Sequence, residues 1–165
     1  MLRWLSELRL SAKFWILGLI ALLMVSLPTG LYVQQALSRL HDAQLQASGI
    51  APVMAVQAII LQVQAHRGTS AGMLGGDATM ASRRPALANA VKQALTQAQQ
   101  TLESSNAPSS LLRSLQALQQ RWTSLEQAVD RRELAAGQSM AQHTALVGEL
   151  MALSEALLNA YHLTV

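Results

Sequence analysis

The sequence contains no cysteine, which excludes disulfides, thiolate catalysis and cysteine-ligated zinc at once. Aromatic residues are also scarce, at 4% of the 165 residues, while Ala, Leu and Gln abound. Strands need β-branched and aromatic side chains, so this composition predicts an all-α fold. Charged residues make up 13% of the chain against 51% hydrophobic residues, which is apolar for a soluble domain but too polar for a bundle of membrane helices. One membrane anchor and one modest helical domain fit these numbers.

The chain has no basic stripe of the kind that binds nucleic acids. Its net charge is +3, but residues 34–165 carry nine basic and eight acidic side chains, so most of the excess lies in residues 1–13. The three Trp and two Tyr are scattered and do not alternate with Lys or Arg. We therefore expect no nucleic-acid partner.

An uncharged run at residues 14–38 predicts a membrane span. Its first twenty residues are nearly all apolar, enough to cross a hydrocarbon core of about 30 Å as one helix. Trp15 and Tyr32 stand near its ends, where amphipathic rings prefer the membrane interface. A cleaved signal peptide is the alternative, but the stretch LPTGLYVQQALS offers no clear cleavage site between small residues. The sequence predicts a transmembrane helix over residues 14–33.

The basic residues around this run predict its orientation. Arg3, Arg9 and Lys13 precede the span, with Glu7 as the one acid among them. By the positive-inside rule, residues 1–13 form a cytoplasmic tail and residues 34–165 lie outside, in the periplasm of a Gram-negative cell. We expect a single-pass protein of a bacterial inner membrane.

The exported part is expected to form four helical stretches. The first continues out of the membrane, with a kink at residues 48–52, and ends at the glycines at 75 and 76. The others are expected at residues 85–103, at residues 109–135 and from residue 139 to the chain end. Their connections are short, and short connections favour antiparallel neighbours. The predicted architecture is an up-and-down periplasmic four-helix bundle.

The stretch VQAHRGTSAGMLGGD at residues 63–77 places an arginine in an apolar stripe. The stripe alternates at spacings of three and four through Val53, Val56, Ile60, Val63, Arg67, Ser70 and Leu74. This spacing predicts that Arg67 points into a helix interface. An arginine keeps its charge, so it needs a negative partner there. Two partners are open: a carboxylate of another helix, from Glu126, Glu149 or Glu155, or a bound anion.

The residues around Arg67 are compatible with an anion site. Gly68 and Gly72 allow close approach, and Thr69 and Ser70 carry hydroxyls that donate hydrogen bonds. The planar fork of a guanidinium matches a planar anion with several oxygens. Simple close packing of a helix end explains the glycines equally well.

The run QAHRGTSA at residues 64–71 resembles the Q-x-x-R-G-x-S signature of the nitrate- and nitrite-sensing (NIT) domain and of the related PilJ-type sensor modules. Those modules stand at the front of bacterial chemoreceptors, sensor kinases and cyclic-di-GMP enzymes. The resemblance implies a periplasmic bundle that binds a small anion, namely nitrate, nitrite or a small carboxylate. It nominates Arg67 as the charge partner, Gly68 and Thr69 as backbone donors and Ser70 as a supporting hydroxyl, with Gln64 and His66 in the same motif.

No other part of the sequence suggests chemistry. The four histidines are scattered without metal-ligand spacing, and His66 near Ser70 lacks an orienting carboxylate and an oxyanion hole. We expect no enzyme, no metal and no cofactor. Arg83 and Arg84 are interpreted as a solvated helix start, His66 as polar lining or a solvated neighbour, and DRRE at residues 130–133 as an exposed charged face.

Two classes of function remain open at this stage. The first is the sensory portion of a transmembrane chemoreceptor or other signal transducer, and the second is a membrane-tethered structural or adaptor bundle without a small ligand. A receptor also needs a cytoplasmic output, so we expect the sequence to be truncated at its C-terminus. The last helix has more apolar residues than one core-facing stripe requires, which predicts a homodimer.

Overall fold

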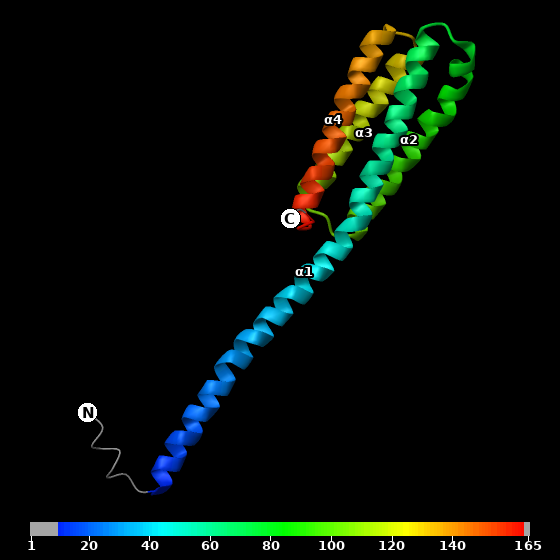
Figure 1. Ribbon diagram of the computed structural model, residues 1–165. Coiled ribbons are helices and arrows are strands. Elements are labelled where there is room, and N and C mark those ends of the chain that lie inside the picture. The colour runs from blue at the N-terminus through cyan, green and yellow to red at the C-terminus, as the bar shows by residue number, and fades with distance from the viewer. Residues whose placement is uncertain (1–9, 164–165) are drawn as a thin grey trace. The chain divides into compact units, whose positions relative to one another are not determined.

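The computed structural model describes residues 10–163 and contains four helices (Figure 1). They are α1 (Leu10–Leu74), α2 (Ala78–Ser104), α3 (Ser109–Asp130) and α4 (Ala136–Ala160). Residues 10–163 include no strand, so the all-α prediction is confirmed. Helix α1 continues through residues 48–52 without interruption.

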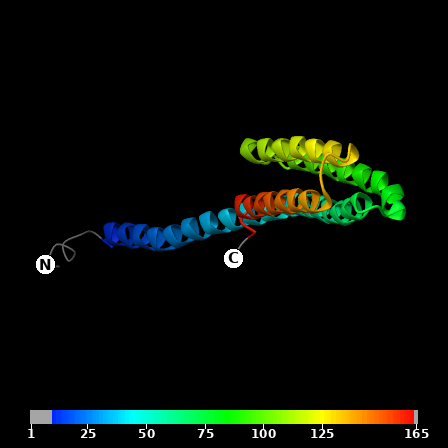
Figure 2. The same cartoon turned by 90° about the horizontal axis from the view of Figure 1, so that it is seen from above.

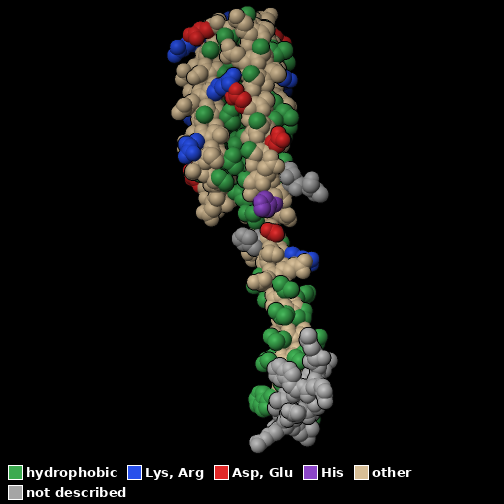
Figure 3. All heavy atoms as spheres, turned by 90° about the vertical axis from the view of Figure 1, so that its left-hand side faces the viewer, with side chains coloured by type: hydrophobic (Ala, Val, Ile, Leu, Met, Phe, Trp, Pro, Cys, Tyr) green, Lys and Arg blue, Asp and Glu red, His purple; other side chains and the backbone are tan. Residues whose placement is uncertain are grey.

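The chain divides into two compact units, residues 1–44 and residues 45–165. In the described part of the first unit, the apolar side chains of α1 are exposed, and Figure 3 shows hydrophobic side chains covering much of it. Within residues 10–163, α1 is the one helix long and apolar enough to cross a membrane, with a window of mean hydropathy 2.1. The expected tail with Arg3 and Arg9 lies largely outside the described residues.

The second unit is a bundle in which consecutive helices run in opposite directions (Figure 1). Side-chain contacts fix this order: Gln57 of α1 bonds to Ser154 of α4, while His66, nearer the end of α1, bonds to His143, nearer the start of α4. Figure 2 shows α4 alongside this part of α1, with α3 in a separate layer. The four helices therefore form the expected up-and-down bundle.

The bundle encloses one core to which all four helices contribute. On α3, five residues at alternating spacings of three and four are buried: Leu115, Leu118, Trp122, Leu125 and Val129. The buried aliphatic residues of α1, α2 and α4 include Val56, Ile59, Val63, Val91, Leu95, Leu102, Leu146, Leu150 and Leu157.

The turn between α1 and α2 differs from the expectation, because α2 begins at Ala78 and not at residue 85. Asp77 caps it: the carboxylate Oδ1 accepts hydrogen bonds from the backbone N–H groups of Thr79 and Met80, at 2.8 and 3.1 Å. Pro85 therefore lies inside the helix. The capping Asp77 is the signal that places this start about two turns earlier than expected.

The connection between α3 and α4 spans residues 131–135 and is longer than the expected connection at residues 136–138. Helix α3 ends at Asp130, and Arg132 adopts a positive φ of 55°. Helix α4 begins at Ala136, where the side-chain oxygen of Gln138 accepts a hydrogen bond from the backbone N–H of Ala135 at 3.0 Å. This cap from the Gln138 side chain accompanies a start of α4 three residues before Ser139.

Candidate functional site

The register of α1 decides which motif residue enters the core, and it is His66. The side chain of His66 is fully buried, together with Ser70, whereas Arg67 is half-buried and Gln64 and Gly68 are exposed. Arg67, which was expected to point into a helix interface, therefore lies beside the buried stripe of α1 and not in it. The buried stripe runs through Val56, Ile59, Val63, His66, Ser70 and Met73.

Arg67 lies at the edge of the contact between α1 and α4. Its Nη1 donates a hydrogen bond to the Thr144 hydroxyl at 3.2 Å. Among residues 10–163, no carboxylate lies within ion-pair distance of this guanidinium. Two of its expected partners are engaged elsewhere, since Glu149 pairs with Arg121 and Glu126 with Arg84.

A chain of hydrogen bonds connects the two buried histidines. Nδ1 of His143 lies 2.7 Å from the carbonyl oxygen of Ser139, which only accepts, so this nitrogen carries the proton. Nε2 of His143 then accepts from Nδ1–H of His66 at 2.9 Å. Nε2 of His66 accepts in turn from Arg84 Nη1 at 3.3 Å, because a guanidinium only donates. Each imidazole is neutral, and its tautomer is set by its neighbours.

Arg84 is the buried arginine of the molecule's described part, with 3% of its surface exposed. Its Nη1 lies 3.1 Å from Glu126, and its Nη2 contacts Asp130. The interpretation of Arg84 as a solvated helix start is therefore wrong. The physical reason is the early start of α2, which carries Arg84 down into the bundle toward α3. The stretch DRRE at residues 130–133 is exposed, as expected, and Asp130 pairs with Arg84 from there.

The pKa values of both histidines are lowered by these surroundings. Burial lowers the pKa of His66 from 6.5 to about 3, with further contributions from the nearby His143 and Arg84. Burial also lowers the pKa of His143, as do the charges of Arg67 and Arg84, against a hydrogen bond to Ser139 that raises it. His66 is thus a buried neutral part of the core and not a solvated neighbour.

The remaining motif residues fall into two groups. Thr69 donates to the backbone oxygen of Ala65 at 2.8 Å, and Ser70 lies 3.2 Å from His66 Nδ1, so both hydroxyls are used inside the bundle. Gln64 and Gly68 line a groove of about 570 Å³ between α1 and α2, where Arg83 is the cationic residue.

The backbone around the motif is regular helix. Helix α1 runs on to Leu74, so the N–H groups of Gly68 and Thr69 are directed to carbonyls one turn earlier. Side chains, and above all the guanidinium of Arg67, are what this site offers to an anion.

The described residues combine a helix long and apolar enough to cross a membrane with a helical bundle whose α1 carries the half-buried guanidinium of Arg67. The family model for nitrate and nitrite sensing matches residues 58–162, well over half of the chain. The chain belongs to this NIT family, as its motif at residues 64–71 indicated. No curated protein and no solved structure matches it.

Sequence reasoning missed Arg84 and His143 as parts of the interior. A signal for Arg84 was present, because Asp77 as a cap starts α2 early enough to bring position 84 onto the face of Val91, Leu95 and Leu102. His143 is preceded by Ser139 and followed by Leu146 and Leu150, so it stands on the buried stripe of α4.

Among residues 10–163, no cluster of three or more His, Asp or Glu side chains has the arrangement of a metal site.

Proposed function

We propose that this chain is the ligand-binding portion of a bacterial transmembrane receptor and that it binds nitrate or nitrite through Arg67. The observation that carries the proposal is the half-buried Arg67 guanidinium, which has one hydrogen bond, to Thr144, and no carboxylate partner within the described residues. Membership of the nitrate- and nitrite-sensing family supports the choice of ligand.

The charge balance around Arg67 favours an external anion. Glu126 and Asp130 together more than offset the charge of Arg84, and the two buried histidines are neutral at physiological pH. The positive charge of Arg67 therefore remains locally uncompensated. A planar oxyanion accepts two parallel hydrogen bonds from a guanidinium. The Thr144 hydroxyl donates to the Met140 carbonyl at 2.8 Å and accepts from Arg67, so it orients the guanidinium.

The six motif residues take different roles in this proposal. Arg67 contacts the anion, and Gln64 and Gly68 lie on the accessible side of α1 near it. His66 is buried and bonds α1 to His143 of α4 and to Arg84 of α2, while the buried Thr69 and Ser70 form hydrogen bonds within α1. They position the guanidinium and do not touch the ligand.

The proposed context is a single-pass inner-membrane protein. Residues 14–33 form its span, residues 1–13 its cytoplasmic tail and residues 34–165 its periplasmic part. The exposed, uncharged first portion of α1 supports this arrangement, and the basic residues before it support the orientation.

We further propose that the periplasmic part forms a homodimer along α1 and α4. Three exposed apolar residues of α1, namely Ile50, Met54 and Leu61, have the spacing of one helical face, and Met151 of α4 is exposed as well. A second copy would cover these side chains and would also bring a second Arg67 into the assembly. Sedimentation of the full chain in detergent should give a dimer that Leu61→Glu dissociates.

Thermal unfolding of the full chain with added salts tests the ligand. Nitrate or nitrite at a hundredfold excess over Kd should stabilise the protein by about 2.7 kcal/mol, and sodium chloride at equal ionic strength should not. Arg67→Ala should remove this effect, and Arg67→Lys should reduce it strongly, because an ammonium lacks the planar fork. Arg113→Ala, which removes an exposed arginine of α3, is the matched control and should leave it unchanged.

The same experiment separates the sensor from an adaptor bundle. An adaptor has no small ligand, so no anion should raise its unfolding temperature. Absence of stabilisation by nitrate, nitrite and small carboxylates would leave the adaptor as the function of this bundle.

A further inference from the structure

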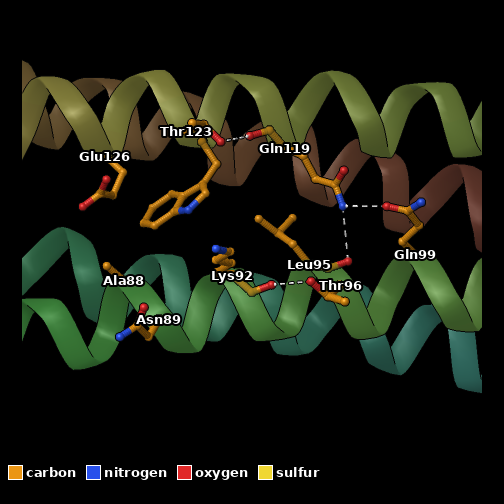
Figure 4. A pocket seen from close by; sticks show the side chains of 10 residues that line it. Ala88, Asn89, Lys92, Leu95, Thr96, Gln99, Gln119, Thr123 and Glu126 are labelled. Atoms are coloured by element: carbon orange, nitrogen blue, oxygen red, sulfur yellow. Dashed lines mark hydrogen bonds between the residues drawn. The ribbon is translucent and has the colours of Figure 1, made fainter.

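A slot of about 520 Å³ lies between α2 and α3, away from Arg67 (Figure 4). One end is closed by Gln119, whose amide nitrogen donates to the Leu95 carbonyl at 3.4 Å and to Gln99 Oε1 at 3.2 Å. Glu126 stands at the other end, where it pairs with Arg84. The slot is therefore bounded at both ends by interactions between the two helices.

Trp122 lines this slot and carries a donor without an acceptor. Its side chain is 95% buried and contacts the His66 ring edge-on, with ring centroids 4.8 Å apart. Within residues 10–163, the indole N–H makes no hydrogen bond. Every fully buried polar side-chain atom of that part of the chain has a partner, so this N–H is one that remains accessible from the slot. Buried indoles normally find an acceptor, so this N–H is available to a polar group that enters the slot.

A positively charged side chain lines the slot, and negatively charged side chains lie at one of its ends. Lys92 of α2 lines it, and in the described part of the chain its ammonium has no ion-pair partner. Toward the other end, Glu126 and Asp130 face the single guanidinium of Arg84, which leaves a net negative charge there. Figure 4 shows Glu126 across from Ala88 and Asn89, and Lys92 one turn further along α2. One turn of helix is about 5.4 Å.

We propose that this slot binds a small zwitterion of the amino-acid type. The ligand carboxylate accepts hydrogen bonds from the Lys92 ammonium and the Trp122 indole N–H. The ligand ammonium lies against the second oxygen of Glu126 and the amide oxygen of Asn89.

Two features favour a zwitterion over an inorganic anion such as nitrate. The net negative end of the slot repels a simple anion, whereas it attracts an ammonium group. The volume of about 520 Å³ is that of a small-molecule site and far exceeds a four-atom ion. The slot is therefore a second ligand site, independent of the anion site proposed at Arg67.

The indole N–H signals of the ¹⁵N-labelled full chain in detergent micelles test the proposal. The chain has three tryptophans, and Trp122→Phe assigns the signal of interest. The twenty protein amino acids and γ-aminobutyrate are added one by one. At least one should move the Trp122 proton downfield and saturate with a Kd of about 10 µM–1 mM. Acetate, methylammonium and nitrate at equal concentration should not.

Two variants and one control assign the charges. Lys92→Met should raise the Kd for the amino acid that shifts the Trp122 signal at least tenfold. Glu126→Gln retains an oxygen for Arg84 while it removes the negative charge, and it should also weaken binding. Arg113→Met removes an exposed cation of α3 outside the slot and should leave the affinity unchanged. The proposal is overturned if no amino acid shifts the Trp122 signal, if acetate or nitrate alone reproduces the shift, or if Lys92→Met leaves the affinity unaltered.

Discussion

His66 Nδ1 lies 2.9 Å from His143 Nε2 in the centre of the bundle, and both side chains are fully buried. This hydrogen bond joins α1 to α4, and it requires one imidazole to donate and the other to accept. A proton added to His143 Nε2 would face the N–H of His66, and a proton added to His66 Nε2 would face Arg84. Either addition breaks the chain that runs from Arg84 to Ser139.

The stability of the bundle should therefore fall in acid. The unfolded chain binds protons on both histidines near pH 6.5, whereas the folded state resists them, with the pKa of His66 at about 3 and that of His143 lowered. Stability is complete above pH 6.5 and is lost as the pH falls toward 3. The loss is about 1.4 kcal/mol per pH unit for each histidine that must stay neutral. The free energy of unfolding, measured with denaturant at several pH values between about 7.5 and 4.5, tests this loss.

Two variants identify the histidines responsible. His143→Gln should flatten the pH dependence, because it removes one buried imidazole, although it also lowers stability at neutral pH. His162→Gln alters an exposed histidine and should keep the wild-type slope. An equal slope in all three proteins would contradict the assignment to the buried pair.

Arg84 and Arg67 should differ sharply in their effect on stability. Arg84→Met leaves Glu126, Asp130 and the His66 acceptor without their partner, so it should cost about 2–4 kcal/mol. Arg67→Met loses one hydrogen bond to a hydroxyl at an accessible position and should change stability by less than about 1 kcal/mol. Urea unfolding compares the two. A larger loss for Arg67→Met would mean that its guanidinium has a structural partner.

Gly49 should be intolerant of a side chain, because Tyr161 lies against it. A Cβ atom added at Gly49 would stand 2.3 Å from Tyr161 Cβ, where no flexible side-chain end can give way. Gly49→Ala should therefore destabilise the bundle by about 1–3 kcal/mol. Gly148→Ala on α4 is the matched control, since a Cβ there meets nothing within 4 Å and should gain up to about 1 kcal/mol of helix propensity. Equal effects of the two variants would show that Tyr161 does not press on α1.

The proposed membrane topology predicts the compartments of reporter fusions. A reporter that is active only in the periplasm should work after Leu111 and fail at the N-terminus, and a cytoplasmic reporter should show the reverse. The opposite pattern would invert the orientation proposed from the basic residues before the span.

The sequence alone was sufficient for the class of fold and the family. Helical periodicity and composition predicted four helices, and the described residues form four. These features depend on local spacing, which the chain carries in itself. The motif at residues 64–71 likewise identified the family that matches residues 58–162.

The sequence could not choose between His66 and Arg67 as the residue that enters the core. From Val63 a step of three leads to His66 and a step of four leads to Arg67, and both steps belong to a helical stripe. The position of α4 beside α1 decides the matter, since His143 receives the His66 hydrogen bond and Thr144 receives that of Arg67. The partners of Arg84 stand 42 and 46 positions away, at Glu126 and Asp130. Local spacing thus determined the helices, and only their packing decided which charges are buried, because burial depends on what the neighbouring helices present.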